Sequence, residues 1–259
     1  MTIFAEPGRR LVIAHRGDKT NFPENTAASF DAALALGVDA IEFDVRLTRD
    51  GQAVVIHDPT LERTTDGHGE VRAHSLRELR RFDAGARFAA VGGGVARPFR
   101  GTGLGILTLD EMLARYHQVP MLIEVKLAEA VPETMRLLRA HGLLGRVLVN
   151  STDQRAVQPF RGVTQTGASL AECVALLARS SLPPFGVRRV PYDALCITPN
   201  FDGIPVPVER LARVVRKLGV PTHVWTVNDP GYAARLWRAG IEGILSDDPG
   251  LMMKVREGL

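Results

Sequence analysis

The chain has 259 residues, of which 45% are hydrophobic, which is enough for one sizeable core. No run approaches the roughly 18 uninterrupted apolar residues of a membrane-spanning helix. The net charge is +3, but the basic residues are scattered and form no motif of the usual nucleic-acid-binding domains. This argues against a nucleic-acid partner.

The N-terminus lacks the charged start, apolar stretch and small-residue cleavage site of a secretory signal. We therefore expect a cytoplasmic protein without stable membrane association. The two cysteines, Cys173 and Cys196, are isolated and have no metal-ligand spacing. They fit a reducing compartment and are expected to be inert.

Short apolar, β-branched segments alternate with helical patterns along the chain. The helical patterns end at Gly37, Gly219 and Gly240, as helices often do. This alternation predicts parallel βαβ units. The candidate strands are residues 11–15, 40–47, 53–57, 120–126, 146–151, 163–167, 194–198, 220–227 and 242–246.

One pair of these strands differs from the others because no helix fits between 40–47 and 53–57. The connection ends in Asp50-Gly51, a strong hairpin signal. The second strand should therefore run antiparallel, which leaves eight parallel strands. Their number and the chain length predict a TIM (β/α)8 barrel, with residues 1–259 forming a single domain.

Residues 59–109 interrupt the alternation and read as an insertion above the barrel. The segment is polar and contains the stretch VGGGVARPFRGTGLG. A phosphate-binding loop would lie between a strand and the start of a helix, and GTGLG does not. A mobile loop is the better interpretation of these glycines.

Charged residues stand where buried strands should be apolar. The first strand ends in His15-Arg16, which indicates an anion site or an ordinary polar loop. Glu42 and Asp44 share one face of the next strand, because side chains alternate with a period of two. Two such carboxylates need either a metal ion or neighbouring arginines, for which Arg46 has the right parity.

The hairpin register brings a histidine into the same region. If Asp50-Gly51 form a two-residue loop, partners have numbers that sum to 101, so Asp44 faces His57. Apart from His15 and His57, we interpret the histidines as core or loop residues. These are His68, His74, His117, His141 and His223.

A third strand carries Glu124 and Lys126 on one face. The C-terminal ends of the strands form the active-site face of a TIM barrel, so all these charges should converge there. Three carboxylates without a cysteine suit one hard divalent cation, Mg²⁺ or Ca²⁺. Arg16 and Lys126 suit phosphate oxygens, and His15 and His57 suit a general acid and base. Together they predict phosphodiester cleavage.

Six motifs in order, HRG, PENT, IEFDV, IHD, IEVK and WTVND, resemble the glycerophosphodiester phosphodiesterase family. The resemblance extends from Leu11 to about Pro249, and LERTTDGHGEV looks like the start of that family's insertion. One departure is the segment 106–109, where many relatives have a proline before the threonine. The absence of a signal makes the chain similar to the cytoplasmic bacterial branch.

The resemblance implies a role for each matching residue. Glu42, Asp44 and Glu124 match the metal ligands, and His15 and His57 match the acid–base pair. Arg16, Lys126 and Trp225 match residues that bind or flank the substrate. Glu24 and Asn25 are expected to support the HRG loop.

The implied reaction releases glycerol 3-phosphate and an alcohol from small glycerophosphodiesters such as glycerophosphocholine or glycerophosphoethanolamine. The glycerol 2-hydroxyl attacks phosphorus, one histidine removes its proton, and the other protonates the departing alcohol. Water then opens the cyclic phosphate. The metal serves as Lewis acid and template, and Arg16 stabilises developing charge.

Two alternatives remain at this point. A lysophospholipase D or sphingomyelinase-D-like enzyme would need an apolar rim, and the insertion offers only scattered residues such as Phe88, Phe99 and Ile106. A non-catalytic barrel that binds a phosphorylated ligand should have lost a site residue. The sequence sets neither the head group, nor the metal, nor whether the chain is a monomer or a homo-oligomer.

Overall fold

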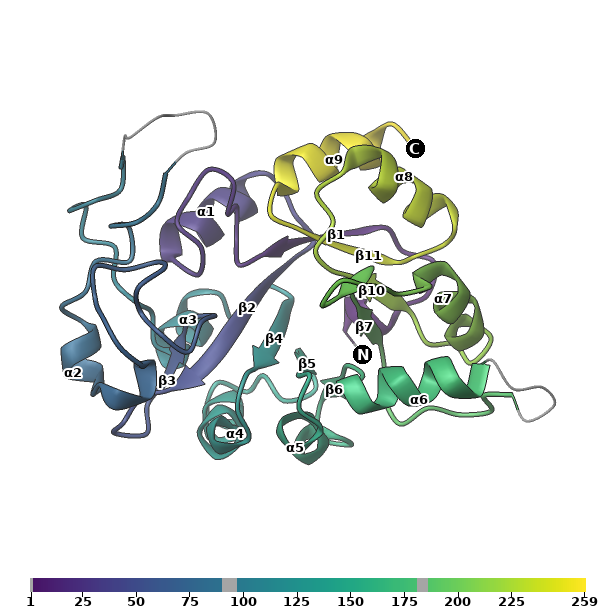
Figure 1. Ribbon diagram of the computed structural model, residues 1–259, viewed down its shortest axis with the longest axis horizontal. Helices are drawn as coiled ribbons and strands as arrows, with labels where there is room; N and C mark the ends of the chain where they lie inside the picture. Colours follow the sequence, from purple (N-terminus) through teal and green to yellow (C-terminus); the bar gives the residue numbers. More distant parts are fainter. Residues whose placement is uncertain (1, 90–96, 181–185) are drawn as a thin grey trace.

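The computed structural model describes residues 2–89, 97–180 and 186–259, and its centre is a barrel of eight parallel strands (Figure 1). The hydrogen-bonded order is β6-β5-β4-β2-β1-β11-β10-β7, and a parallel bridge from Gly167 to Ala194 joins the two end strands. The TIM-barrel prediction is confirmed. The strands are β1 (Leu11–His15), β2 (Ala40–Leu47), β4 (Met121–Val125), β5 (Leu148–Asn150), β6 (Gln165–Thr166), β7 (Leu195–Ile197), β10 (Thr222–Val224) and β11 (Gly243–Ser246).

Helices surround the barrel, and Gly37, Gly219 and Gly240 adopt positive φ just beyond three of them, as predicted. None of the helices in the three described ranges is long and apolar enough to cross a membrane. The helices are α1 (Ala27–Ala35), α2 (Leu76–Leu79), α3 (Leu109–Arg115), α4 (Val131–Ala140), α5 (Gln154–Val157), α6 (Leu170–Ser180), α7 (Val208–Arg216), α8 (Pro230–Arg238) and α9 (Pro249–Glu257).

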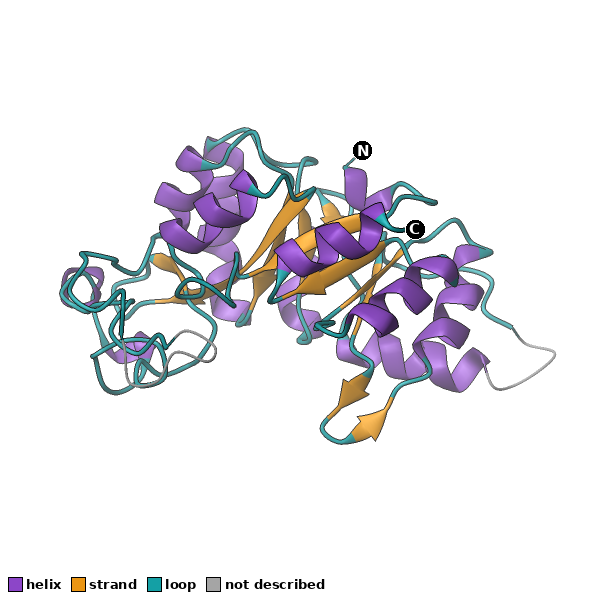
Figure 2. Cartoon of the chain, turned by 90° about the horizontal axis from the view of Figure 1, so that it is seen from above, coloured by secondary structure: helices purple, strands orange, loops and turns teal. Residues whose placement is uncertain are grey.

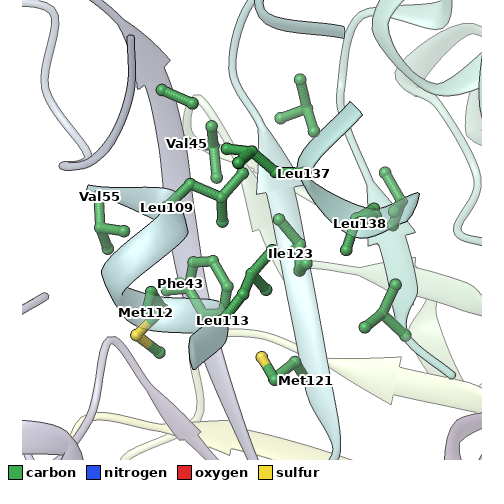
Figure 3. Packing of buried hydrophobic residues seen from close by; sticks show 14 of the residues in the cluster. Phe43, Val45, Val55, Leu109, Met112, Leu113, Met121, Ile123, Leu137 and Leu138 are labelled. Atoms are coloured by element: carbon green, nitrogen blue, oxygen red, sulfur yellow. The ribbon is translucent and has the colours of Figure 1, made fainter. Parts of the chain in front are cut away.

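Side-chain alternation divides each long strand between two environments. Phe43 and Val45 of β2 and Ile123 of β4 point outward and pack against α3 and α4 (Figure 3). The intervening positions point into the barrel, where Leu11, Leu122 and other apolar side chains fill the interior. Glu42, Asp44 and Glu124 have this inward parity, so the acids face the barrel axis as the period of two requires.

The predicted hairpin register is wrong by one residue. β3 (Ala53–Val55) is antiparallel to β2, but its pairs, such as Val45 with Val55, sum to 100. The loop has three residues because Gly51 adopts φ +77° and the Thr48 hydroxyl donates to Asp50 and accepts from the Gln52 amide. His57 is therefore not paired with Asp44 and lies beyond the end of the strand.

The described part of the insertion has secondary structure and a small core of its own. Between β3 and α3 it contains α2 and a small apolar cluster that includes Ile56, Leu61, Val71 and Leu79. In Figure 1 it extends to the side of the barrel beside β3. Residues 90–96, which include most of VGGGVA, lie outside the described residues.

A small hairpin, β8 (Asn200–Phe201) and β9 (Ile204–Pro205), was not predicted. It projects from the barrel in Figure 2. Its turn residues, Asp202 and Gly203, both have positive φ, as a two-residue hairpin loop requires. The strands are too short to produce a visible alternation, although Asp-Gly is the same turn signal found at 50–51.

His223, for which the sequence left core and loop positions open, is a fully buried core histidine. It hydrogen-bonds through Nε2 to the Phe4 carbonyl at 2.8 Å, and its Nδ1 has no hydrogen-bond partner. Burial lowers the pKa of His223 to about 4. The folded protein therefore holds this imidazole in its neutral form.

This burial predicts a loss of stability in mild acid. Below about pH 6.5 the unfolded chain binds a proton at His223 that the folded chain does not, so the unfolding free energy should fall as pH decreases toward 4. Urea denaturation should show wild type losing about 2 kcal/mol more between pH 7 and pH 5 than His223→Gln. Equal losses in the two proteins would contradict the prediction.

Candidate active site

The loop after β1 contains residues with left-handed backbone conformations. Arg16 and Gly17 have φ values of +60° and +88°, and a Cβ on Gly17 would lie 2.4 Å from the Ser29 Oγ. Asn25 is also left-handed, at φ +58°, and its backbone N–H donates to the Arg16 carbonyl at 3.0 Å. The HRG and PENT motifs therefore form one folded unit, with Glu24 and Asn25 supporting the loop.

Three carboxylates converge at the C-terminal end of the barrel. Glu42, Asp44 and Glu124 each offer an oxygen within 4.8 Å of the others. Asp44 is fully buried and pairs in register with Glu124 on the next strand. Its Oδ1 atom has no hydrogen bond of good geometry among the described residues. A set of three clustered hard oxygen donors, one of them fully buried, fits a divalent cation such as Mg²⁺ or Ca²⁺.

Two cations also neutralise the cluster. Lys126 Nζ lies 2.9 Å from Asp44 Oδ1 and 2.8 Å from Glu124 Oε2. Arg16 Nε lies 3.1 Å from Asp44 Oδ2, and its Nη1 is 3.0 Å from Glu24 Oε1. Arg46, the cation that the parity argument favoured, instead donates Nε to the His57 carbonyl at 2.6 Å.

The electrostatics separate the two acids of β2. Burial, together with repulsion from Asp44, raises the pKa of Glu42 well above its usual range. Burial opposes ionisation of Asp44 as well, but Lys126 and Arg16 outweigh it and lower the pKa of that carboxyl. The pKa values of the two carboxyls are therefore shifted in opposite directions.

His15 is held by a partner from the last strand. Its Nδ1 lies 2.7 Å from Asp247 Oδ1, immediately after β11. Asp247 Oδ2 accepts hydrogen bonds from Lys19 at 3.2 Å and Asn228 at 3.1 Å. The other ring nitrogen of His15, Nε2, faces the carboxylate cluster and lies 3.9 Å from Glu42 Oε2. A carboxylate on Nδ1 fixes the orientation of the imidazole.

His57 has an equivalent support from its neighbour in the chain. Its Nδ1 lies 2.6 Å from Asp58 Oδ1, and Arg63 bridges Asp58 to Glu24. Burial lowers the pKa of His57, even though Asp44 acts in the opposite direction. The pKa of Asp58 is lowered to about 2, because the bonds from Arg63 and His57 outweigh its burial. The lowered pKa of His57 favours its neutral form.

The predicted residues meet around one cavity of about 360 Å³. Seven of the eight line it, and the eighth, Asp44, is buried beneath it. Trp225 and Cys196 form part of the wall, and burial raises the pKa of the Cys196 thiol, which fits an inert cysteine. The seven lining residues are His15, Arg16, Glu42, His57, Glu124, Lys126 and Trp225.

The sequence interpretation missed the residues that orient the histidines. Asp247 contacts His15 directly, and Asn228 holds Asp247, because its Oδ1 accepts from the Asp247 backbone amide at 2.9 Å. A signal existed, because Asp247 directly follows a buried strand, where parallel strands collect functional side chains. Asp58 is the last residue of the IHD motif, and the sequence interpretation gave it no role of its own.

Comparisons with known proteins identify the family. Residues 15–251 match the model described as "Glycerophosphoryl diester phosphodiesterase family". A glycerophosphodiester phosphodiesterase of Caldanaerobacter subterraneus is 31% identical over 96% of this chain and 99% of its own length. One of Bacillus subtilis is 28% identical over 97% of this chain and 88% of its own length.

Solved structures have the same architecture. A glycerophosphodiester phosphodiesterase from Agrobacterium tumefaciens superposes with a TM-score of 0.74 at 26% identity, over 95% of this chain and 99% of its own. An Oleispira antarctica phosphodiesterase, solved with its product sn-glycerol-3-phosphate, has a TM-score of 0.77 at 24% identity, over 99% of this chain and 100% of its own. The likeness at 24% identity supports the fold alone.

The contact between Asp247 and His15 predicts a loss of activity when the carboxylate is removed. Asp247→Asn should lower kcat/KM by between about 10²- and 10⁴-fold, because the imidazole loses its fixed tautomer and orientation. The pH profile should change as well. Steady-state kinetics across pH 5–9, with the melting temperature as a check on folding, measure the effect.

Asp248→Asn is the matched control for this substitution. Asp248 caps α9 by accepting from the Leu251 amide at 2.9 Å, and asparagine caps equally well. The activity of Asp248→Asn should equal that of wild type. A folded Asp247→Asn protein with full activity would show that Asp247 does not orient His15.

Proposed function

The chain belongs to the glycerophosphoryl diester phosphodiesterase family and is an enzyme of that class; from this premise we propose that it hydrolyses small glycerophosphodiesters to glycerol 3-phosphate and an alcohol. One observation carries the proposal. A cluster of three carboxylates, two of which line the cavity, lies beside two histidines that are each held at Nδ1 by an aspartate. Glycerophosphocholine and glycerophosphoethanolamine are the proposed substrates.

In this proposal Glu42, Asp44 and Glu124 hold one divalent cation, Mg²⁺ or Ca²⁺. When bound, such a cation supplies Lewis-acid stabilisation of charge on a phosphate oxygen. Lys126 and Arg16 lie beside the carboxylates and are the cations available to the phosphate. Trp225 lines the same cavity and would flank the substrate there.

The histidines carry the proton transfers. Burial lowers the pKa of His57 and favours the neutral imidazole, so His57 suits the base that takes the proton of the glycerol 2-hydroxyl, which attacks phosphorus. His15, oriented by Asp247, then suits the acid that protonates the departing alcohol. Water opens the resulting cyclic phosphate, and the two roles are reversed in that second step.

Removing either imidazole should abolish most turnover without removing the metal. We expect His15→Ala and His57→Ala each to lower kcat by about 10²- to 10⁴-fold, since each removes one acid–base group. Release of glycerol 3-phosphate from glycerophosphocholine gives the rate, and calorimetric titration checks metal binding. His117→Ala, at an exposed position, is the control and should match wild type. Near-normal turnover in either site variant would refute the two-histidine account.

Metal dependence is a separate expectation. EDTA should stop the reaction, and added Mg²⁺ or Ca²⁺ should restore it. Glu124→Gln should weaken binding of the restoring cation by at least about tenfold in calorimetry, because one hard ligand is lost. Glu129→Gln is the matched control, since Glu129 is an exposed acid outside the cluster. Turnover that persists in EDTA, or equal metal affinity in wild type and Glu124→Gln, would contradict the assignment.

A further inference from the structure

An apolar groove of about 260 Å³ lies beside the catalytic cavity. Leu170, Val174 and Leu177 of α6 form one wall, and Phe201 and Ile204 of the β8–β9 hairpin form another. Figure 1 places α6 next to β7 and α7, and Figure 2 shows the hairpin projecting from the barrel. The groove therefore lies on the half of the barrel remote from the insertion.

Exposed apolar side chains are concentrated on this groove. Six large hydrophobic side chains are exposed in the described part of the chain, and four of them line the groove. Val174 is 58% exposed and Ile204 is 67% exposed. Exposed apolar side chains that gather around one concave surface mark a binding site more often than chance exposure does.

The groove is continuous with the catalytic cavity. Asn150, Thr152, Cys196 and Trp225 line both spaces. A molecule whose phosphate sits beside the three carboxylates can therefore extend an apolar arm past Trp225 into the groove. The arm meets no carboxylate, lysine or arginine among the described residues that line the groove.

We propose that this groove binds the hydrocarbon chain of a monoacyl glycerophosphodiester, a lysophospholipid-type substrate of the same active site. The inference rests on the proposed function and names a substrate class for it. An uncharged apolar groove stabilises a hydrocarbon chain through burial, and it offers nothing to a charged head group. The apolar rim that a lipid substrate needs is thus on α6 and β8–β9, not on the insertion.

The chemistry of the site accommodates this substrate without a new step. A single acyl chain on the terminal glycerol oxygen leaves the 2-hydroxyl free. That oxygen forms a bond to phosphorus, the bond to the head-group oxygen breaks, and the hydroxyl proton passes to one histidine while the alcohol receives a proton from the other. Water then opens the cyclic phosphate and yields a monoacylglycerol phosphate.

A chain-length series tests the proposal with substrates kept below their micelle concentrations. Phosphocholine diesters of monoacylglycerol with 4, 6, 8 and 10 carbons are compared with glycerophosphocholine. Each buried methylene should raise kcat/KM about fourfold until the groove is full, after which the values should level off. Values that do not rise with chain length, alongside normal turnover of glycerophosphocholine, would overturn the inference and leave the proposed function standing.

Variants of the groove locate the effect. Val174→Asp and Ile204→Glu should each lower kcat/KM for the eight-carbon substrate by at least about tenfold and leave glycerophosphocholine unchanged. Val163→Asp is the matched control, because Val163 is exposed but lies outside the groove, and it should affect neither substrate. Unchanged eight-carbon kinetics in both groove variants would contradict the proposal.

Two other outcomes are distinguishable. If no substrate is hydrolysed with Mg²⁺ or Ca²⁺, the proposed function itself fails, and the inference fails with it. If wild type sediments as a dimer that Val174→Asp converts to a monomer, and kcat/KM does not rise with chain length, the groove is covered by a second copy of the chain and the lipid proposal is wrong.

Discussion

The buried carboxylate of Asp44 is the interaction on which the rest of the site depends. It is fully removed from solvent, and burying a carboxylate without partners costs several kcal/mol. Asn25 Nδ2 donates to it at 2.9 Å, and Arg16 and Lys126 supply the opposing charges at 3.1 and 2.9 Å. These three partners come from the HRG loop, the PENT turn and the end of β4. The requirement to satisfy one carboxylate therefore determines where three separate segments lie.

The same requirement accounts for the backbone around it. Arg16 and Asn25 both adopt left-handed φ, which side chains other than glycine rarely do. That conformation is maintained because the Asn25 amide and the Ser29 hydroxyl both donate to the Arg16 carbonyl. Strain of this kind persists only where the surroundings over-determine the geometry. The loop thereby delivers His15 to the cavity in a fixed position.

The two histidines are supported by charge networks that meet at the HRG loop. Asp58 reaches Glu24 through Arg63, and Glu24 pairs with Arg16. On the other side, Asp247 is held by Lys19 and Asn228. The polar half of the cavity is thus rigidly cross-linked, whereas the wall shared with the groove is formed by Trp225, Cys196 and short polar side chains. This division of polarity matches a substrate with a charged phosphate and an apolar arm.

The sequence by itself determined the features that depend on local periodicity. The period of two put Glu42 with Asp44, and Glu124 with Lys126, on inward faces, and the alternation of elements indicated the barrel whose strand ends bring them together. The sequence does not distinguish a two-residue from a three-residue turn at Asp50-Gly51, because both turns use a left-handed glycine. Only the tertiary structure decided what depends on distant contacts. Asp247 reaches His15 across 232 positions of the chain, Lys126 rather than Arg46 neutralises Asp44, and α6 and β8–β9 form the groove, because closing the barrel brings residues together that no local pattern relates.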